Sequence, residues 1–161
     1  MSAHQTDTMN DAEHPFEHPM DHIIVRPLDF EVEKLEPHRV VWSDTSPEFA
    51  IYLNAFGVHV PYFERYLIRS MSTAKKHVSN ERLRADMSAI TGQEAHHAKN
   101  FLEFNKVLAD RYPRVAELDA RARLYFTEHA KTDSLMRLVG FTAGYETFTF
   151  LAGMIILEIG R

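Results

Sequence analysis

The sequence predicts an all-α protein with an extended N-terminal arm. From Ser46 onward, apolar residues recur at spacings of three and four, as they do along one face of a helix. No alternating strand pattern and no Asn-Gly hairpin signal competes with this periodicity. A chain of 161 residues is about one domain long, which is enough to build its own hydrophobic core. We therefore expect one helical metal-binding bundle over residues 46–161, preceded by an arm and a tail.

The first 22 residues are expected to form a disordered, His-rich tail. Residues 1–22 hold four of the ten histidines, several acids and few large apolar side chains, a composition that cannot offset the entropy lost on ordering. The His-Pro pairs resemble a small metal-collecting tract. However, each proline favours an extended backbone before it, which keeps His14, His18 and His22 off a common helix face.

The next segment, residues 23–45, is expected to be an extended arm packed on the bundle. Its short apolar runs are interrupted by Pro27 and Pro37, which do not fit inside a regular helix. The expected anchors of this arm are Ile23, Ile24, Phe30 and Trp42.

About four helices are expected to follow. Ser46 and Pro47 predict the start of the first, and Pro61 inside its pattern predicts a kink or a break. Asn80 is expected to cap the second helix, which has the most regular periodicity of the chain. The expected inward faces are Leu53, Gly57, Val60, Glu64, Leu67 and Met71 in the first helix, and Leu83, Met87, Ile90, Glu94, His97, Phe101, Phe104 and Leu108 in the second.

The third helix is expected to begin at Pro113 and to end near Lys131, and Thr132 or Asp133 is expected to cap the fourth. The expected inward faces are Val115, Leu118, Ala122, Tyr125 and His129 in the third helix, and Leu135, Val139, Thr142, Glu146, Thr149, Gly153 and Ile156 in the fourth.

Composition excludes several classes of function. With 18 Lys and Arg against 23 Asp and Glu, the chain has no basic excess to neutralise a nucleic-acid backbone. No cysteine occurs, so thiolate metal sites, disulfides and cysteine nucleophiles are excluded, and any metal must be held by His, Glu and Asp. The N-terminus lacks the basic start and apolar run of a secretory signal, so we expect a cytoplasmic protein.

The candidate site begins with Glu94 and His97. A Glu-x-x-His spacing places a carboxylate and an imidazole on one helix face, where both can bind one metal ion. The position is more informative than the motif, because both residues replace apolar side chains on an apolar face. An unpaired carboxylate is costly to bury there.

Two further glutamates repeat this feature: Glu64 interrupts the inward face of the first helix and Glu146 that of the fourth. Three carboxylates and one imidazole suit iron or manganese, and zinc is an alternative. Ordinary ion pairs are the competing interpretation. They would join Glu64 to Arg65, Arg69 or Lys75, and Glu94 to Lys99 or a histidine. Of the other histidines, His129 is expected at the edge of the core, and His59 has no supporting neighbour.

Three segments carry a family resemblance: residues 61–70 (PYFERYLIRS), the run Gln93-Glu94-x-x-His97, and residues 142–149 (TAGYETFT). With the arm, they resemble the bacterial family of predicted metal-dependent hydrolases, which is similar to the ferritin-like di-iron carboxylate proteins. The resemblance implies a ferritin-like bundle and an enzyme acting on a small molecule, either a hydrolase or a di-iron oxidase or oxygenase. It also places Glu64, Glu94, His97 and Glu146 at metal-ligand positions, with one or two iron ions.

The sequence departs from that family in two ways. Phe63 stands where the family usually has glycine. Only one Glu-x-x-His is present, whereas the ferritin-like scheme needs two, and family members are longer, with a further helix carrying a Glu-Glu-x-Glu-His-like segment. The chain could hold one metal, complete a two-metal site with another chain, or be a truncated product. Because the last helix is apolar on more than one face, we expect a homodimer.

A membrane-associated or non-enzymatic helical interaction protein is the alternative. Residues 139–157 form a 19-residue window with one charge, near the length of a membrane span, and contain Gly140-x-x-x-Gly144. Glu146 counts against this interpretation, since a carboxylate within a span is costly.

Overall fold

A computed structural model describes residues 23–34 and 41–159, and in this part of the chain it contains helices and no strand. The all-α bundle is confirmed, whereas the expected disorder of residues 1–22 lies outside the described residues. The α-helices are α1 (Pro47–Gly57), α2 (Val60–Ala74), α3 (Glu81–Arg111), α4 (Pro113–Thr132) and α5 (Leu135–Ile159), and the short 3-10 helices are η1 (Val32–Lys34) and η2 (Lys75–His77).

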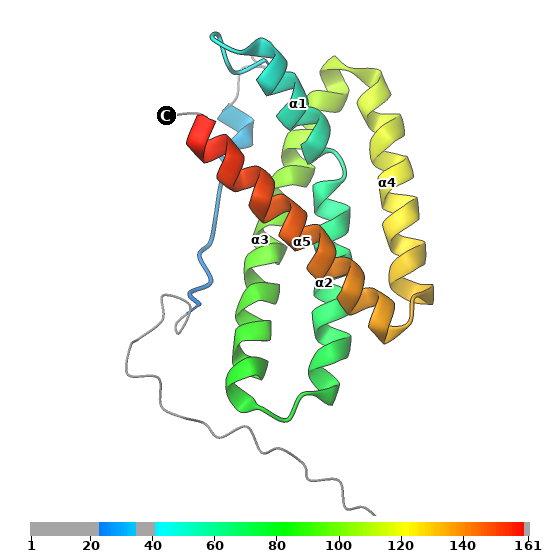
Figure 1. Ribbon diagram of the computed structural model, residues 1–161. Coiled ribbons are helices and arrows are strands. Elements are labelled where there is room, and N and C mark those ends of the chain that lie inside the picture. The colour runs from blue at the N-terminus through cyan, green and yellow to red at the C-terminus, as the bar shows by residue number, and fades with distance from the viewer. Residues whose placement is uncertain (1–22, 35–40, 160–161) are drawn as a thin grey trace, which may run out of the picture.

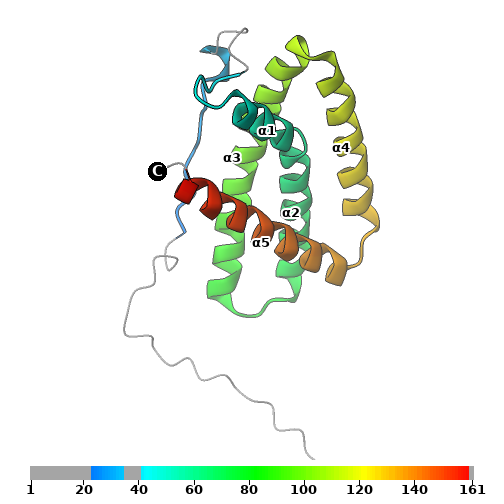
Figure 2. The ribbon, with the colours of Figure 1, turned by 45° about the horizontal axis from the view of Figure 1, so that its top comes forward.

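Helix α2 lies at the centre of the bundle. It contacts α3, α4 and α5, and α3 also contacts α4. Figure 1 shows α3, α2 and α4 side by side, with α5 crossing them diagonally on one side, and the turned view in Figure 2 shows the same arrangement. The contacts of α5 are made chiefly with α2, so most of its surface faces away from the other helices.

The break expected near Pro61 separates α1 from α2. The helix stops at Gly57 and resumes at Val60, and Pro61 lies in the first turn of α2, where its missing N–H leaves no backbone bond unmade. The side chain of Asn105 donates to the carbonyls of Gly57 (3.4 Å) and Val58 (3.1 Å), which are left free by the break. The expected break is confirmed, and it raises the number of helices above the four expected.

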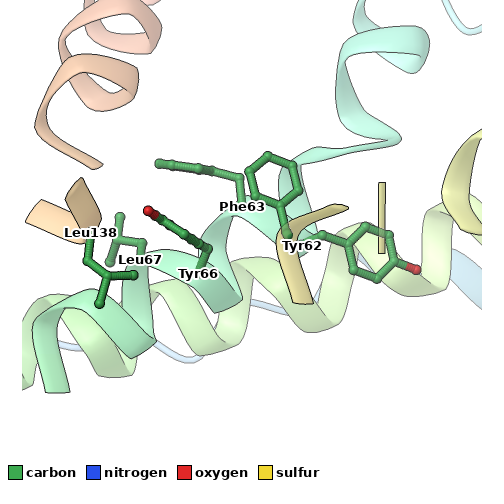
Figure 3. Close-up of a cluster of buried hydrophobic side chains, with 6 residues drawn as sticks. Tyr62, Phe63, Tyr66, Leu67 and Leu138 are labelled. Carbon is green, nitrogen blue, oxygen red and sulfur yellow. The ribbon is translucent and has the colours of Figure 1, made fainter. Parts of the chain in front are cut away.

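The core is built mainly from one helix. Helix α2 contributes Tyr62, Phe63, Tyr66 and Leu67, and these pack with Phe126 of α4 and Leu138 of α5. Figure 3 shows the α2 side chains and Leu138. The ring of Phe63 stacks on Tyr145 of α5 at 3.5 Å between centroids, so it fills the space between α2 and α5. This packing fixes α2 and therefore Glu64, which follows Phe63 directly.

The helix caps were predicted in part. The side chain of Asn80 accepts the Leu83 N–H at 2.9 Å, which confirms the cap of α3. For α5 the prediction of Thr132 or Asp133 was wrong. Asp133 ends α4, and the Ser134 hydroxyl accepts the Arg137 N–H at 3.4 Å. Because Ser, Thr and Asp all suit the N-cap position, three such residues in a row leave the boundary undetermined from sequence.

The inward face expected for α4 was rotated by about one residue. Phe126 is buried, at 7% exposure, whereas Tyr125 is 48% exposed and Leu118 is also exposed. The positions 124–126 are all apolar, so the periodicity alone did not select which of them faces α2.

The arm runs along α3 and is held mainly by polar contacts. The Arg26 N–H donates to Gln93 Oε1 (2.9 Å), the Phe30 N–H donates to Asn100 Oδ1 (2.8 Å), and Asn100 Nδ2 donates to the Leu28 carbonyl (2.8 Å). A Cβ at Gly92 would lie 3.1 Å from a Val25 methyl, so the close approach depends on this glycine. Of the expected anchors, Ile24 is exposed and Ile23 is partly buried. Phe30 and Trp42 are about half exposed, and their rings pack edge-on against Phe101 and Phe49.

Candidate metal centre

The structure brings together three of the four residues expected at a metal site. Glu64 of α2 and Glu94 and His97 of α3 each offer a ligand atom, and these atoms lie within 4.8 Å of one another. The Nδ1 atom of His97 is 3.2 Å from Glu94 Oε2 and 3.7 Å from Glu64 Oε1. Glu94 and His97 share a face of α3 because they are three residues apart, and that face is turned toward α2.

Glu64 is the buried member of this cluster, with 4% of its surface exposed. Its Oε2 atom is buried and has no hydrogen-bond partner among the described residues. Burial, followed by the charges of Glu94 and Glu146, raises the pKa of Glu64 to about 9. A carboxylate in this position needs a compensating positive charge in order to be ionised at neutral pH.

No Lys or Arg of the described part of the chain supplies that charge. Among the described residues, the ion pairs of Glu64 and Glu94 involve only His97. Lys75 donates instead to Ser88 Oγ, and Lys99 lies 3.9 Å from Glu103. Within residues 23–34 and 41–159, the alternative ion pairs of Glu64 and Glu94 with lysine or arginine are therefore not formed, whereas the alternative contact of Glu94 with a histidine is formed, with His97.

His97 is oriented by contacts on both sides of its ring. The hydrogen bond to Glu94 raises the pKa of His97, burial acts in the opposite direction, and the charges of Glu94 and Glu146 raise it further. On the far side, Nε2 of His97 lies 3.2 Å from Nε2 of Gln93. Because Gln93 Oε1 already accepts the Arg26 N–H, the amide group donates to the ring, and Nδ1 faces the carboxylates.

Glu146 lies at the edge of the cluster and not inside it. Its side chain is exposed, and Oε2 accepts from Thr149 Oγ1 at 3.3 Å. The inward face expected for α5 was right at Thr142, which is buried, and wrong at Val139 and Glu146, because Leu138 and Tyr145 turn toward α2 in their place. Glu146 still acts on the cluster, since its charge raises the pKa of Glu64 and of His97. Its role as a metal ligand stays a prediction.

Two features of the site were not expected from the sequence. Gln93 connects His97 to the arm, and its spacing of four residues from His97 on a helix was a signal for that contact. His59, which had no supporting neighbour in sequence, has its Nε2 atom 2.5 Å from the Tyr145 hydroxyl. These two residues are far apart in the chain, so no spacing connects them. His129 pairs with Asp133 at the end of α4.

The residues present fit a divalent metal ion. The Glu64 and Glu94 carboxylates and the His97 imidazole each offer one ligand atom within 4.8 Å of the others, and a cation there would remove the cost of burying Glu64 ionised. Two carboxylates and one imidazole are hard and borderline ligands, which suit iron, manganese or zinc.

An all-α bundle with carboxylates and an imidazole on facing helices is typical of helical metal-binding proteins. Residues 24–160 match the model of a family described as predicted metal-dependent hydrolase. Because this match covers most of the chain, the chain belongs to that family. No curated protein and no solved structure matches it.

Proposed function

We propose that this chain is a metal-dependent hydrolase whose divalent cation is held by Glu64, Glu94 and His97. The observation that carries this proposal is the Glu64 carboxylate, which is buried, without a hydrogen-bond partner on one oxygen, and within reach of two further ligand groups. Family membership supports the same reaction class. The substrate is proposed to be a small molecule.

A bound divalent cation would supply Lewis acidity toward a carbonyl or phosphoryl oxygen and would lower the pKa of a water molecule. The protein contributes ligands and their orientation. Glu64 is positioned by its neighbour Phe63, whose ring packs against Tyr145 of α5 and Phe126 of α4. The His97 ring is held by Glu94 and Gln93. These contacts would orient the ligand side chains toward a bound metal ion.

We propose Glu146 as the general base. It is exposed at the edge of the cluster, where a substrate has access, and it lies close enough for its charge to influence both Glu64 and His97. Burial and the charge of Glu94 raise the pKa of Glu146, which makes the carboxylate a better proton acceptor. In this proposal Glu146 accepts a proton, while Glu64 and Glu94, the two carboxylates beside His97, bind the metal ion.

A di-iron oxidase or oxygenase on a ferritin-like bundle is the second candidate. The observation favouring it is the excess of carboxylates over imidazoles, with Glu146 adding a third carboxylate near one histidine. Oxygen-rich ligand sets of this kind suit iron and its reactions with oxygen.

A reconstitution experiment separates the two candidates. The metal-free protein would be loaded with zinc, manganese or iron(II) and assayed against ester, amide and phosphoester panels, with and without oxygen. Metal-dependent hydrolysis that is lost in His97→Ala and kept in His129→Ala, a control histidine on α4, supports the hydrolase. Oxygen consumption with iron alone supports the oxidase, and the absence of metal binding contradicts both.

A further inference from the structure

Helix α5 carries a long apolar surface that nothing covers in the described part of the chain. Figures 1 and 2 show it on the outside of the bundle, with the other helices on one side only. Its large apolar side chains on this surface are between 39% and 84% exposed. They are Met136, Val139, Phe141, Phe148, Phe150, Leu151, Met154, Ile155 and Leu157.

The size of this surface matches that of one side of a stable protein interface. The exposed fractions of the nine side chains are together equivalent to about five fully exposed large residues, or roughly 800–1,000 Å² at about 150–200 Å² each. Stable interfaces bury about 800 Å² per partner. Contiguous apolar patches larger than about 300–600 Å² are uncommon on monomers, so a surface of this size indicates a binding partner.

The shape of the surface favours a helix as that partner. Helical spacing places Gly140, Ala143, Gly144 and Thr147 on the side of α5 opposite Leu138 and Thr142, which face α2. A Cβ added at Gly140 or Gly144 would meet nothing within 4 Å, so this shallow groove of small residues is open. Large apolar side chains stand beside it, and a helix lying in the groove can approach closely while covering them.

The charges on α5 favour a second α5 in antiparallel orientation. Arg137 and Glu158 carry opposite charges and lie near opposite ends of α5. The outer surface between them is uncharged except for Glu146 at its flank. Thr147 lies midway between them. In an antiparallel pair centred on Thr147, Arg137 of one copy lies beside Glu158 of the partner subunit. The Arg137 side chain is 59% exposed and contacts Asp133 through Nε, so the guanidinium retains outward N–H donors.

From these observations we propose that the chain forms a twofold symmetric homodimer in which the two α5 helices pack antiparallel across the groove of Gly140, Ala143, Gly144 and Thr147. A twofold axis makes each copy present the same surface to the other, so the apolar patch is self-complementary. This inference goes beyond the metal-dependent activity and does not rest on it.

A lipid bilayer is the competing occupant of this surface. The segment Leu135–Glu158 is the one helix among the described residues that is long and apolar enough to cross a membrane. However, Thr142, Tyr145 and Thr149 lie on its inner side, and Glu146 falls in the middle of the segment. A carboxylate at that depth would cost a few kcal/mol, which favours a protein partner.

The decisive experiment measures the molar mass of the full chain by sedimentation and light scattering between about 0.1 and 100 µM, the range that resolves Kd values typical of modest interfaces. The wild type is expected to be a dimer. Phe148→Glu and Gly144→Leu are expected to shift the dimer midpoint by at least tenfold. Leu124→Glu, at an equally exposed leucine on α4, is the matched control and is expected to leave the dimer intact.

Charge exchange tests the antiparallel orientation separately. Glu158→Arg alone places two cations together and is expected to weaken the dimer, and Arg137→Glu combined with Glu158→Arg is expected to restore it. Circular dichroism checks that each variant is folded. A monomeric wild type overturns the proposal, as does flotation of the wild type with phosphatidylcholine vesicles. An equal effect of Phe148→Glu and Leu124→Glu also overturns it. Molar mass is independent of metal content, so the metal proposal is not tested by this result.

Discussion

Replacing Glu64 by glutamine is expected to stabilise the metal-free protein at alkaline pH. The pKa of Glu64 is raised from 4.5 to about 9 in the folded state, chiefly by burial. At a pH between these two values, the Glu64 carboxyl is deprotonated in the unfolded chain and protonated in the folded chain. Stability of the metal-free wild type therefore falls as pH rises from 4.5 toward 9, by up to about 1.36 kcal/mol per pH unit.

The size of the effect follows from that interval. At pH 7.5, three pH units above the pKa of Glu64 in the unfolded chain, Glu64 has lowered the free energy of unfolding of the wild type by up to roughly 4 kcal/mol. Glutamine has nearly the same shape and no charge, but its buried amide lacks partners, which costs roughly 1–3 kcal/mol. Glu64→Gln is therefore expected to be more stable than the wild type by roughly 1–3 kcal/mol at pH 7.5 and less stable than the wild type at pH 5.

Urea denaturation from pH 5 to pH 8.5 in the presence of a chelator measures this difference. Subtracting the free energy of unfolding of the variant from that of the wild type at each pH cancels the other titrating groups and leaves the contribution of Glu64. Glu117→Gln is the matched control, because Glu117 is half-exposed on α4 and pairs with Arg121, and it is expected to follow the wild type within about 0.5 kcal/mol. Stability curves for Glu64→Gln and the wild type that run parallel across this range would contradict a raised pKa of Glu64 in the folded state.

Three further changes test the fold around the site. Phe63→Ala removes a ring that is 1% exposed and stacked on Tyr145, so it is expected to lower the free energy of unfolding by about 3–5 kcal/mol; a loss below about 1 kcal/mol in urea denaturation would contradict the packing described. Asn80→Ala removes the cap of α3 and is expected to cost about 1 kcal/mol, measured by thermal unfolding, with no change if the cap is not formed. Asn100→Ala removes both side-chain bonds to the arm, so amide exchange at residues 28–30 is expected to accelerate while α2 amides are unchanged. If the variant and the wild type exchange the amides of residues 28–30 at the same rate, the arm is held by other contacts.

The sequence predicted the placement of the candidate residues best where its periodicity was clear. In α3, apolar residues interrupted only by Glu94 and His97 indicated one inward face. The structure brings both residues close to Glu64 of α2, although Leu83 at the start of that face is 48% exposed. Glu64 was placed in the same way, because the apolar positions before and after it define one side of α2. For these helices, the contrast between polar and apolar faces contains the information that packing uses.

Helix α5 shows why the rest could not be predicted. Its residues are apolar on nearly every side, so no periodicity distinguishes the face against α2 from the face toward solvent. The expected face was therefore rotated, and Glu146 was expected inside the bundle although it lies at the edge. The pair of His59 and Tyr145 illustrates a second limit, since contacts between distant residues depend on how helices cross and leave no local pattern.

The metal content of the purified protein is the most direct test of a metal centre at Glu64, Glu94 and His97. It would be measured by inductively coupled plasma mass spectrometry for the wild type and for the double variant Glu94→Ala/His97→Ala. We expect iron, manganese or zinc at about one ion or more per chain in the wild type, and loss of that metal in the double variant with the helical content retained. Equal metal content in both proteins, or none in either after loading, would contradict a metal centre at Glu64, Glu94 and His97.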